Sequence, residues 1–271
     1  MRLAHLSLTS CLTPYSRGLS IQSQLIQRHV DYKALTSRHA LQFASTTENH
    51  LQNEGRIDST PEPDPVLLTL QHTPTYTIGR RELGRIPLSQ QNFLTENQRA
   101  VFHESPRGGQ ITFHGPGQIV IYPILSLRTH RLTPRCYIRL LENTVISTLS
   151  KFGVKGTSTE NPGVWLEGGD KKIASVGVNV RRGVTGHGVA VNVEDRAGEL
   201  KWGFGRIVAC GLEGKEVTWL SEETKTRKDG IPETNNISVS DVENVFVREF
   251  AKGLGGVEEV YQIQEEDLMS S

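Results

Sequence analysis

Hydrogen-bonding side chains are concentrated in one glycine-rich stretch, which runs from Arg107 to Gln118 and reads RGGQITFHGPGQ. It supplies one guanidinium, one imidazole, one hydroxyl and two carboxamides. Four glycines and one proline leave little side chain to pack, so the backbone must either turn tightly or approach a ligand closely. The β-branched run 119–125 that follows predicts a strand. The stretch is therefore either a polar hairpin turn or a binding loop beside a strand.

A candidate nucleophile lies in the segment 208–212, where Cys210 stands between small residues. A cysteine in such surroundings is commonly a buried core thiol. As a nucleophile, a thiolate suits acyl exchange with a thioester, because the acyl-enzyme stays activated toward a later attack by an amine. Cys11, expected at the start of the first helix, and Cys136, expected in the first turn of another, lie in no comparable segment. Three widely spaced cysteines predict neither a disulfide framework nor a zinc cluster and fit a reducing compartment.

A thiolate needs a base or a positive neighbour to form at neutral pH, and the spacing of the histidines shows no Cys-His-Asn arrangement. Lys172 is a candidate because it opens a run of small and aliphatic residues, 173–178, whereas Lys171 has the pattern of an ordinary surface lysine. His114 and His187 each precede a glycine, so each is either a structural residue that holds a turn or a member of the site. His187 is the next candidate for the base after Lys172.

The composition is that of a globular protein. At 271 residues, of which 36% are hydrophobic, the chain can bury a sizeable core. Thirty Lys and Arg balance thirty Asp and Glu, so the net charge favours neither nucleic acid nor an anionic membrane as a partner. No apolar run approaches roughly 18 residues, which excludes a spanning helix. The sequence shows no metal-ligand set and no Gly-x-x-x-x-Gly-Lys-Ser/Thr nucleotide loop, so it predicts neither a metal nor a nucleotide cofactor.

The first half of the chain reads as rich in strands. A short strand at 3–8 precedes a helix that Thr13 and Pro14 begin and that runs to about Leu35. Residues 1–30 weakly resemble an organellar transit segment, but their helical spacing favours a first helix of the fold. A polar, proline-containing segment, 45–65, predicts a surface insertion. Further strands are expected at 66–70 and 75–78.

The second half alternates helix, strands and helix. Thr133 and Pro134 begin a helix that ends at Gly153, and strands follow at 163–166, 172–180 and 187–193. Hairpin turns join these three strands, so they are expected to form an antiparallel part of one sheet. A second polar insertion is predicted at 221–237. Ser240 is expected to cap a last helix, and the acidic tail from Glu265 is expected to fray.

The stretch from Arg107 to Gln118, with its apolar strand, resembles the signature of the lipoyl(octanoyl) transferases, which move an octanoyl group from acyl carrier protein onto a lipoyl-domain lysine. Cys210 followed by glycine is similar to the nucleophile segment of that family. Lys172 stands where the family places a lysine before Ile-Ala/Cys-Ser/Ala-x-Gly, which selects it over Lys171. The resemblance extends from the first helix to Cys210. It departs from the family in Ala209, where proline is common, and in two insertions that are longer than in compact bacterial members.

The resemblance implies one α/β domain over residues 1–271, with a mixed, largely antiparallel sheet flanked by helices, similar to biotin and lipoate protein ligases. It implies that Cys210 forms an acyl thioester and that Lys172 promotes the thiolate and carries a proton, with no metal and no cofactor. Small residues and exposed backbone N–H groups would hold the acyl chain and its oxyanion. The segments that would line the acyl pocket comprise Arg107, Gly108, Gly109, Gln110, Ile111, Thr112, Phe113, His114, Ser175, Val176, Gly177, Gly188, Val189 and Ala190, with His187 as a supporting residue.

The same resemblance implies the partners. These are acyl carrier protein as donor, and as acceptors the lipoyl domains of 2-oxoacid dehydrogenase acyltransferase subunits and the glycine cleavage H protein, in the first step of endogenous protein lipoylation. The long insertions are typical of fungal members, whose family works in mitochondria. Two alternatives stay open: an ATP-dependent lipoate or biotin ligase on the same scaffold, which would not require Cys210, and a non-catalytic protein that binds lipoyl domains.

Overall fold

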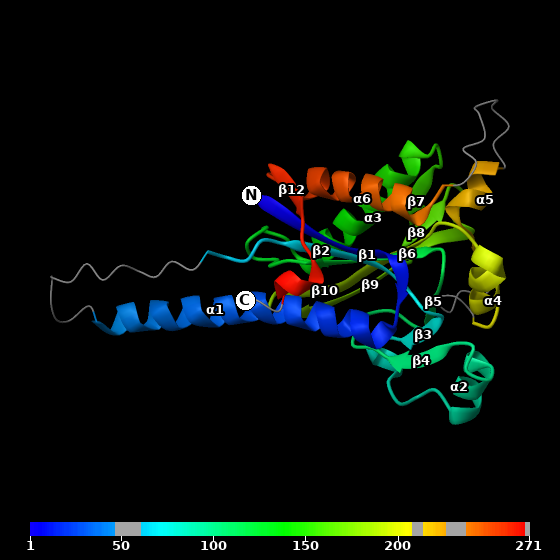
Figure 1. The fold of residues 1–271 in the computed structure, drawn as a ribbon, viewed down its shortest axis with the longest axis horizontal. Coiled ribbons are helices and arrows are strands. Elements are labelled where there is room, and N and C mark those ends of the chain that lie inside the picture. The colour runs from blue at the N-terminus through cyan, green and yellow to red at the C-terminus, as the bar shows by residue number, and fades with distance from the viewer. Residues whose placement is uncertain (47–60, 208–213, 226–236, 269–271) are drawn as a thin grey trace.

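The computed structural model describes residues 1–46, 61–207, 214–225 and 237–268. Within them, a nine-stranded mixed sheet has the order β12-β1-β2-β6-β10-β9-β8-β7, with β11 beside β9, and a second sheet has the order β4-β3-β5 (Figure 1). The strands of the large sheet are β1 Arg2–Thr13, β2 Val66–His72, β6 Gln118–Ile124, β7 Gly156–Ser158, β8 Val164–Leu166, β9 Lys171–Arg181, β10 Val184–Asn192, β11 Glu216–Val217 and β12 Glu259–Gln262. Those of the small sheet are β3 Thr75–Ile78, β4 Val101–Glu104 and β5 Thr112–His114.

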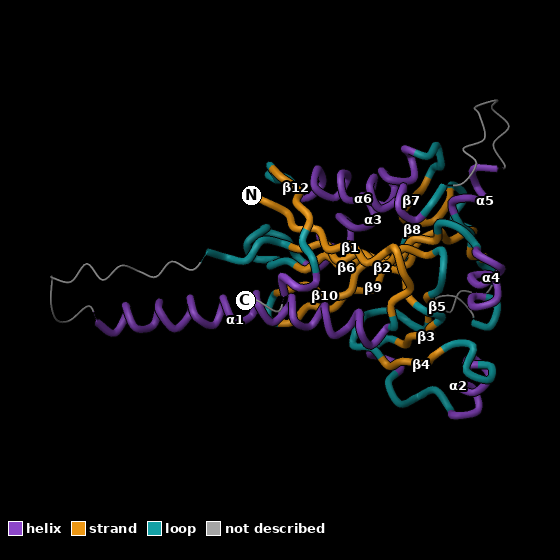
Figure 2. The backbone as a smooth tube through the Cα atoms, in the orientation of Figure 1, coloured by secondary structure: helices purple, strands orange, loops and turns teal. Residues whose placement is uncertain are grey.

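Helices cover both faces of the large sheet (Figure 2). The helices are α1 Tyr15–Thr46, α2 Leu88–Thr95, α3 Pro134–Lys151, α4 Glu199–Phe204, α5 Leu220–Lys225 and α6 Val239–Leu254, with short 3₁₀ turns at η1 Arg80–Glu82, η2 Arg196–Gly198 and η4 Glu265–Leu268. On one face α3 and α6 pack together on the sheet through residues such as Leu141 and Phe246. On the other face α1 packs through Ile21 and Leu25. No helix of the described chain has the length and apolarity needed to cross a membrane.

The small sheet packs with α2 and α4 into a separate cluster of buried side chains. Tyr76 of β3 and Phe113 of β5 meet Leu94 of α2 and Phe204 of α4 in this cluster. The Tyr76 hydroxyl donates to the Gly203 carbonyl at 2.8 Å, which attaches α4 to β3. After α1, the chain therefore adds β2 to the large sheet and then β3 to this smaller lobe.

The predicted α/β class, a mixed sheet flanked by helices, is confirmed, and so are the hairpins that join β8, β9 and β10 in antiparallel order. The Thr133 cap of α3 is also confirmed, because its side chain accepts from the Cys136 N–H at 3.1 Å. A bulge between β8 and β9 is the one irregularity in their pairing.

Several predicted boundaries were wrong. The first strand extends to Thr13, so Cys11 lies in β1 and not at the start of α1, and α1 continues to Thr46. Residues 221–225 belong to α5, while 47–60 and 226–236, where most of the two predicted insertions fall, lie outside the described residues. The cap of α6 is Ser238, which forms a reciprocal capping box with Asp241, because Ser240 already lies inside the helix. These errors share one cause: polar residues near an element's end carry little periodicity.

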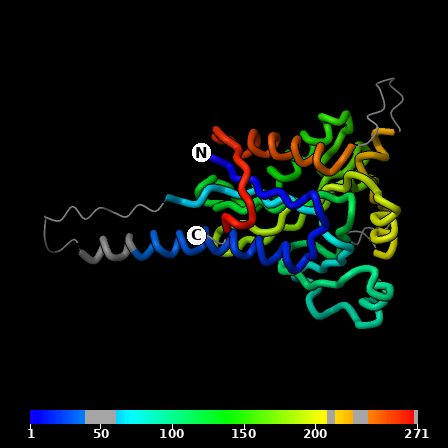
Figure 3. The backbone as a smooth tube through the Cα atoms, viewed as in Figure 1, coloured from blue at the N-terminus to red at the C-terminus, as the bar shows by residue number. Residues whose placement is uncertain are grey.

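The described part of the acidic tail, residues 265–268, also differs from the prediction, because it forms the turn η4 against the fold. Strand β12 pairs in parallel with β1, so the blue and red ends of the chain lie side by side in Figure 3. Glu265 then pairs with Arg17 at 2.7 Å, and Leu268 is buried against the face that α1 covers.

One buried carboxylate joins α6 to the edge of the large sheet. Glu243 accepts hydrogen bonds from Ser7 Oγ at 2.6 Å and Thr9 Oγ1 at 2.7 Å, and also from Thr69, while His5 Nε2 lies 3.3 Å away. Burial alone would raise the pKa of Glu243, but these hydrogen bonds outweigh it and lower the pKa to about 2. The ionised form is therefore part of the packing between α6, β1 and β2.

We predict that Glu243 makes the stability of the fold depend on acid pH. Its folded pKa of about 2 lies below the ordinary 4.5, so the stabilisation is fully present above pH 4.5 and is lost as the pH falls toward 2. This lowering of the Glu243 pKa corresponds to on the order of 3 kcal/mol in the free energy of unfolding. Urea unfolding at stepped pH should therefore show a shallower decline between pH 4.5 and 2 for Glu243→Gln than for the wild type. Glu259→Gln, at an exposed position of β12, should keep the wild-type slope, and identical slopes for all three proteins would contradict the prediction.

Candidate active site

A cavity of about 750 Å³ lies between the large sheet and the glycine-rich stretch. One wall is β9, whose half-buried residues 175–180 border the cavity, while Val176, Val178 and Val180 also pack against the core cluster that contains α3 and α6. The segment 187–190 of β10 and alternate residues of β6 extend this wall, and residues 106–112 form the opposite side. Tyr15, at the start of α1, closes one part of the lining. The cavity thus takes its residues from elements that are far apart in the sequence.

Arg107 fixes the glycine-rich stretch to the small sheet. Its guanidinium donates through Nη2 to the Thr77 carbonyl at 2.7 Å and through Nε and Nη2 to Thr77 Oγ1 at 3.1 and 2.7 Å. The same side chain donates through Nη1 to the carbonyl of Gly108 at 2.9 Å. A buried guanidinium with this many acceptors holds its loop in one conformation. The principal role of Arg107 in this structure is therefore to shape the rim of the cavity.

The glycine-rich stretch crosses directly over β9. The Gly108 N–H donates to the Val178 carbonyl at 2.9 Å, and a Cβ on Gly177 would stand 2.9 Å from the Gly108 carbonyl oxygen. A side chain at Gly177 would therefore push the loop away from the strand. Gly177 thus allows the loop backbone to contact the backbone of β9, and this contact sets the depth of the cavity.

Below the rim, His114 belongs to a chain of hydrogen bonds whose direction can be assigned. Gln118 donates through Nε2 to Asn192 Oδ1 at 2.9 Å, so its Oε1 must accept from His114 Nδ1 at 2.7 Å. On the other side, His114 Nε2 faces Thr77 Oγ1 at 3.5 Å. The imidazole is therefore the neutral Nδ1–H tautomer. Asn192 in turn donates to the Thr218 carbonyl at 2.9 Å, which extends the chain to the strand edge beside Lys172.

The titratable rings around the cavity are neutral at physiological pH. Burial lowers the pKa of His187 to about 3 and, together with the neighbouring His72, lowers that of His114 well below its ordinary value. Burial likewise raises the pKa of Tyr15 and of Tyr122. None of these rings is poised to exchange a proton near neutral pH.

His187 has an unusual backbone conformation. Its φ of 54° lies in the left-handed region, which is uncommon for a residue with a Cβ. The Gln22 side chain accepts its backbone N–H, and its ring meets Tyr122 edge to face with centroids 5.6 Å apart. Such local strain is characteristic of functional sites, where the surrounding structure enforces it. Here it turns the ring toward the cavity.

Lys172 occupies the end of the cavity near the loop 161–162. Although it stands near the beginning of β9, its side chain is only 3% exposed, which excludes the alternative of an ordinary surface lysine. Its ammonium donates to the Pro162 carbonyl at 2.9 Å and lies 5.1 Å from the centroid of the Trp165 ring. Lys171, by contrast, is exposed and pairs with Glu223 at 3.4 Å. The two neighbouring lysines therefore have different environments.

Gly163 makes room for the Lys172 side chain. Its φ is 124°, and a Cβ there would lie 2.5 Å from the Ala174 carbonyl oxygen and 2.6 Å from Lys172 Cε. The Gly163 N–H donates to the buried Glu142 carboxylate at 2.9 Å, which attaches this loop to α3. The loop, the helix and the lysine thus form one packed unit.

Comparison with known proteins shows the family to which the chain belongs. The family described as the lipoyl protein ligase A/B catalytic domain matches residues 45–251. The chain belongs to this family. The mitochondrial octanoyltransferase of Saccharomyces cerevisiae is 34% identical over 281 residues, covering 93% of this chain and 82% of the yeast protein. The mitochondrial octanoyl-acyl-carrier-protein:protein N-octanoyltransferase of Danio rerio is 41% identical over 176 residues, covering 65% of this chain and 74% of its own.

Solved structures show the same fold in this family. A putative lipoate protein ligase from T. acidophilum superimposes with a TM-score of 0.58 at 15% sequence identity, covering 100% of this chain and 93% of its own. At this identity the likeness establishes the architecture and not the chemistry.

The structure of this lipoyl ligase A/B domain brings most of the predicted site residues around one cavity. Phe113 is an exception. Strand side chains alternate, so Thr112 and His114 face the cavity while Phe113 faces the core of the small lobe beside Tyr76. Cys210 lies outside the described residues. The remaining predicted lining residues and the candidate base do border the cavity, as listed here: Arg107, Gly108, Gly109, Gln110, Ile111, Lys172, Ser175, Val176, Gly177, His187, Gly188, Val189 and Ala190.

The sequence-based prediction missed several residues of the cavity. Tyr122 could have been found, because it is two positions from Val120 on a strand that follows the glycine-rich stretch. Tyr15 and Arg81 could not, because only the tertiary fold brings them to the cavity. Nothing in their local pattern distinguishes them from core or surface residues.

We predict that Gly163→Ala of this domain destabilises it more than a matched substitution. Gly168→Ala is the control, because Gly168 also has a positive φ, 102°, but a Cβ there would meet no atom within 4 Å. Both variants should lose about 1 kcal/mol from backbone strain, and Gly163→Ala should lose a further 1–3 kcal/mol from the clash with Ala174 and Lys172. Chemical unfolding measures the difference. Equal losses would show that the loop yields without disturbing Lys172.

Proposed function

We propose that this chain transfers an octanoyl group from acyl carrier protein to the target lysine of lipoyl domains. The observation that carries the proposal is the cavity itself, with Lys172 buried at one end and a lining of small, aliphatic and neutral groups along β9 and β10. No Asp or Glu is among the described residues that line it. An uncharged acyl chain fits such a lining, and a cation at its end suits a developing negative charge. The yeast relative is named an octanoyltransferase, and the name of the zebrafish relative adds octanoyl-acyl-carrier-protein as the donor and a protein as the acceptor.

In the proposed reaction, the thiolate of Cys210 attacks the thioester carbon of the donor. The carbon–sulfur bond to the donor breaks, the donor leaves as a thiol after taking up a proton, and the octanoyl group remains on Cys210 as a thioester. The amine of the acceptor lysine then attacks that thioester, loses a proton and releases Cys210 as thiolate. Lys172 supplies positive charge beside the thiolate and carries the proton in each half-reaction. The neutral His114 and His187 hold the cavity and take no proton.

The proposal needs no cofactor, because the donor arrives as an activated thioester. An ATP-dependent ligase on the same fold is the competing function, and a non-catalytic lipoyl-domain binder is the other. Release of pyrophosphate would identify a ligase, and the absence of any turnover would identify a non-catalytic binder. Parallel assays with octanoyl-carrier protein and with free octanoate plus ATP separate all three.

The chain is a mitochondrial protein, as its yeast and zebrafish relatives are. Within mitochondria, the proposed acceptors are the lipoyl domains of 2-oxoacid dehydrogenase acyltransferase subunits and the glycine cleavage H protein. Both present a lysine on a small folded domain, so one cavity suffices for both. Incubation with each acceptor followed by intact-mass measurement tests this assignment.

Cys210→Ala should abolish both transfer and the acyl adduct. Cys11→Ala and Cys136→Ala are the controls, because both cysteines are exposed and neither lies at the cavity. Mass spectrometry of protein mixed with octanoyl-carrier protein alone should show one octanoyl group on the wild type and on both controls. Transfer by Cys210→Ala would refute the thioester mechanism.

Lys172→Met should reduce transfer by about 10²- to 10⁴-fold, the usual worth of a positioned acid or base. It also removes the donor to the Pro162 carbonyl, so a loss of about 1–3 kcal/mol in stability accompanies it and must be measured. Lys171→Met, at the exposed neighbour, should stay near wild-type activity. Iodoacetamide should alkylate Cys210 only at higher pH in Lys172→Met. If the alkylation profile does not move and activity matches Lys171→Met, the base lies elsewhere.

A further inference from the structure

We propose that the carrier protein docks on a surface formed by Arg80, Arg81, Leu83, Arg85 and Leu88, which we call the donor surface. The proposal rests on the proposed function and adds to it the face of the molecule that the donor uses. The partner it fits is an acidic protein that bears the acyl group on a flexible arm.

The charge of the donor surface is positive and locally unbalanced. The side chains of Arg80, Arg81 and Arg85 are exposed, and none of them forms an ion pair with another described residue. Two acidic residues lie nearby: Glu82, which is half-buried, and Glu104, whose exposed carboxylate accepts from the Gly84 N–H at 2.8 Å, so three arginines stand against two carboxylates. The whole chain has 30 basic and 30 acidic residues, so this excess is a property of the surface and not of the protein. Such a patch attracts an acidic partner and raises its association rate.

The donor surface adjoins the cavity. Arg80 and Arg81 are themselves lining residues. The Arg80 N–H donates to the Arg107 carbonyl at 3.0 Å, so the 3₁₀ turn η1 is attached to the glycine-rich stretch that forms the cavity rim. A protein bound to these arginines can therefore reach the cavity with its acyl arm without any rearrangement of the rim.

Exposed apolar side chains accompany the arginines. Leu83 is 40% exposed and Leu88 is 72% exposed, and Phe93 and Val101 of the same lobe are 55% and 49% exposed. These are four of the seven large hydrophobic side chains that are exposed in the described chain. Their concentration in one lobe indicates an interaction surface, because arginine beside exposed apolar groups is typical of protein interfaces.

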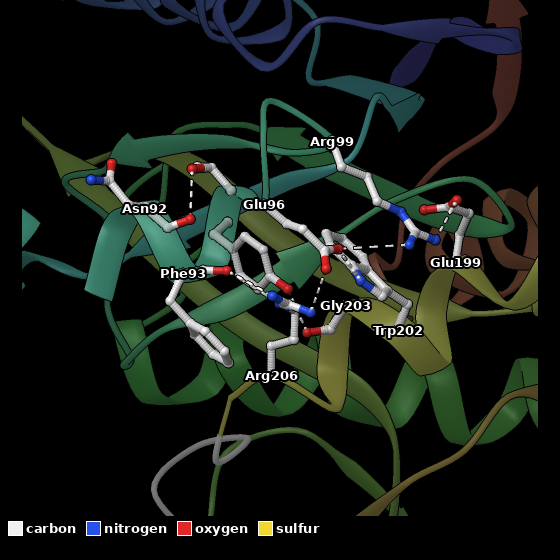
Figure 4. Close-up of polar contacts among 10 residues, drawn as sticks. Asn92, Phe93, Glu96, Arg99, Glu199, Trp202, Gly203 and Arg206 are labelled. Atoms are coloured by element: carbon white, nitrogen blue, oxygen red, sulfur yellow. Dashed lines mark hydrogen bonds and ion pairs between the residues drawn. The ribbon is translucent and has the colours of Figure 1, made fainter. Parts of the chain in front are cut away.

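A polar cluster holds this lobe in place (Figure 4). Arg206 donates through Nη2 to the Phe93 carbonyl at 2.9 Å and pairs with Glu96 at 3.3 Å, and Glu96 accepts from Trp202 Nε1 at 2.8 Å. The guanidinium of Arg99 lies 4.1 Å from the centroid of the Trp202 ring. These contacts attach α2 to α4. A lobe that is already ordered loses little further conformational entropy when a partner binds.

The charge of the donor surface favours the donor over the acceptor. A lysine that approaches the cavity past Arg80 and Arg81 would bring an ammonium group toward two like charges. A carrier arm attached through a phosphodiester would instead bring an anion toward them. The surface therefore suits the carrier protein, and the lipoyl domain would reach the cavity by another side.

The test compares two donors on one triple variant, Arg80→Glu/Arg81→Glu/Arg85→Glu. For octanoyl-carrier protein, KM should rise about tenfold or more at near-physiological salt, and this rise should be several times larger than the rise for octanoyl-pantetheine, which lacks both the protein and the phosphate. Arg28→Glu/Arg38→Glu/Arg248→Glu is the matched control, since it makes the same change in net charge at exposed positions on α1 and α6. Its KM for octanoyl-carrier protein should stay within about twofold of the wild type.

Equal rises for the two donors in the triple variant would overturn the proposal, because the arginines would then only shape the cavity. A rise in KM for the lipoyl domain without one for the carrier protein would also overturn it, since the surface would belong to the acceptor. Titration of octanoyl-carrier protein into Cys210→Ala with and without the triple substitution measures binding without turnover. Weaker binding supports the surface even if wild-type turnover fails, a result that would refute only the proposed function.

Discussion

The cavity depends on one backbone contact, in which the glycine-rich stretch crosses β9. Gly108 donates to Val178, and Gly177 lacks the Cβ that would separate the two chains. The Arg107 guanidinium holds the loop in place from the other side by its bonds to Thr77. Together these contacts fix a loop that has few side chains of its own to pack. The two sheets meet along this line, so the small lobe and the large sheet each supply one wall of the cavity.

The electrostatics follow from that enclosure. Burial keeps His114 and His187 uncharged, while Arg107 and Lys172 keep their hydrogen bonds to carbonyl oxygens. A cavity with neutral rings and positive ends suits an uncharged acyl chain.

Most of the fold was predictable because its elements carry strong local signals. The α3 helix has a capping threonine and an N1 proline, and the strands β8 to β10 are separated by glycine turns. The second sheet was not predicted, because β4 has no apolar alternation and pairs in parallel with β3 across the 22 residues 79–100. The long extent of α1 was also not predicted.

The candidate site divides in the same way. Residues in one continuous stretch, such as His114, could be identified from sequence. Which of them face the cavity could not be predicted, and Phe113 faces the core of the small lobe. The burial of Lys172 depends on the loop 161–163, which lies ten residues away and has no periodicity. Arg80 and Tyr15 reach the cavity only through tertiary packing. Position in a motif therefore does not by itself give the direction in which a side chain points.

The contact between Lys172 and Trp165 gives the site an optical reporter. An ammonium 5.1 Å from an indole ring shifts the energy of its excited state, so the emission of Trp165 depends on where the Lys172 charge lies. The chain has three tryptophans, and Trp202 lies away from the cavity between Arg99 and Arg206. With Trp202 and Trp219 replaced by phenylalanine, the remaining fluorescence would follow the filling of the cavity in real time, without any label.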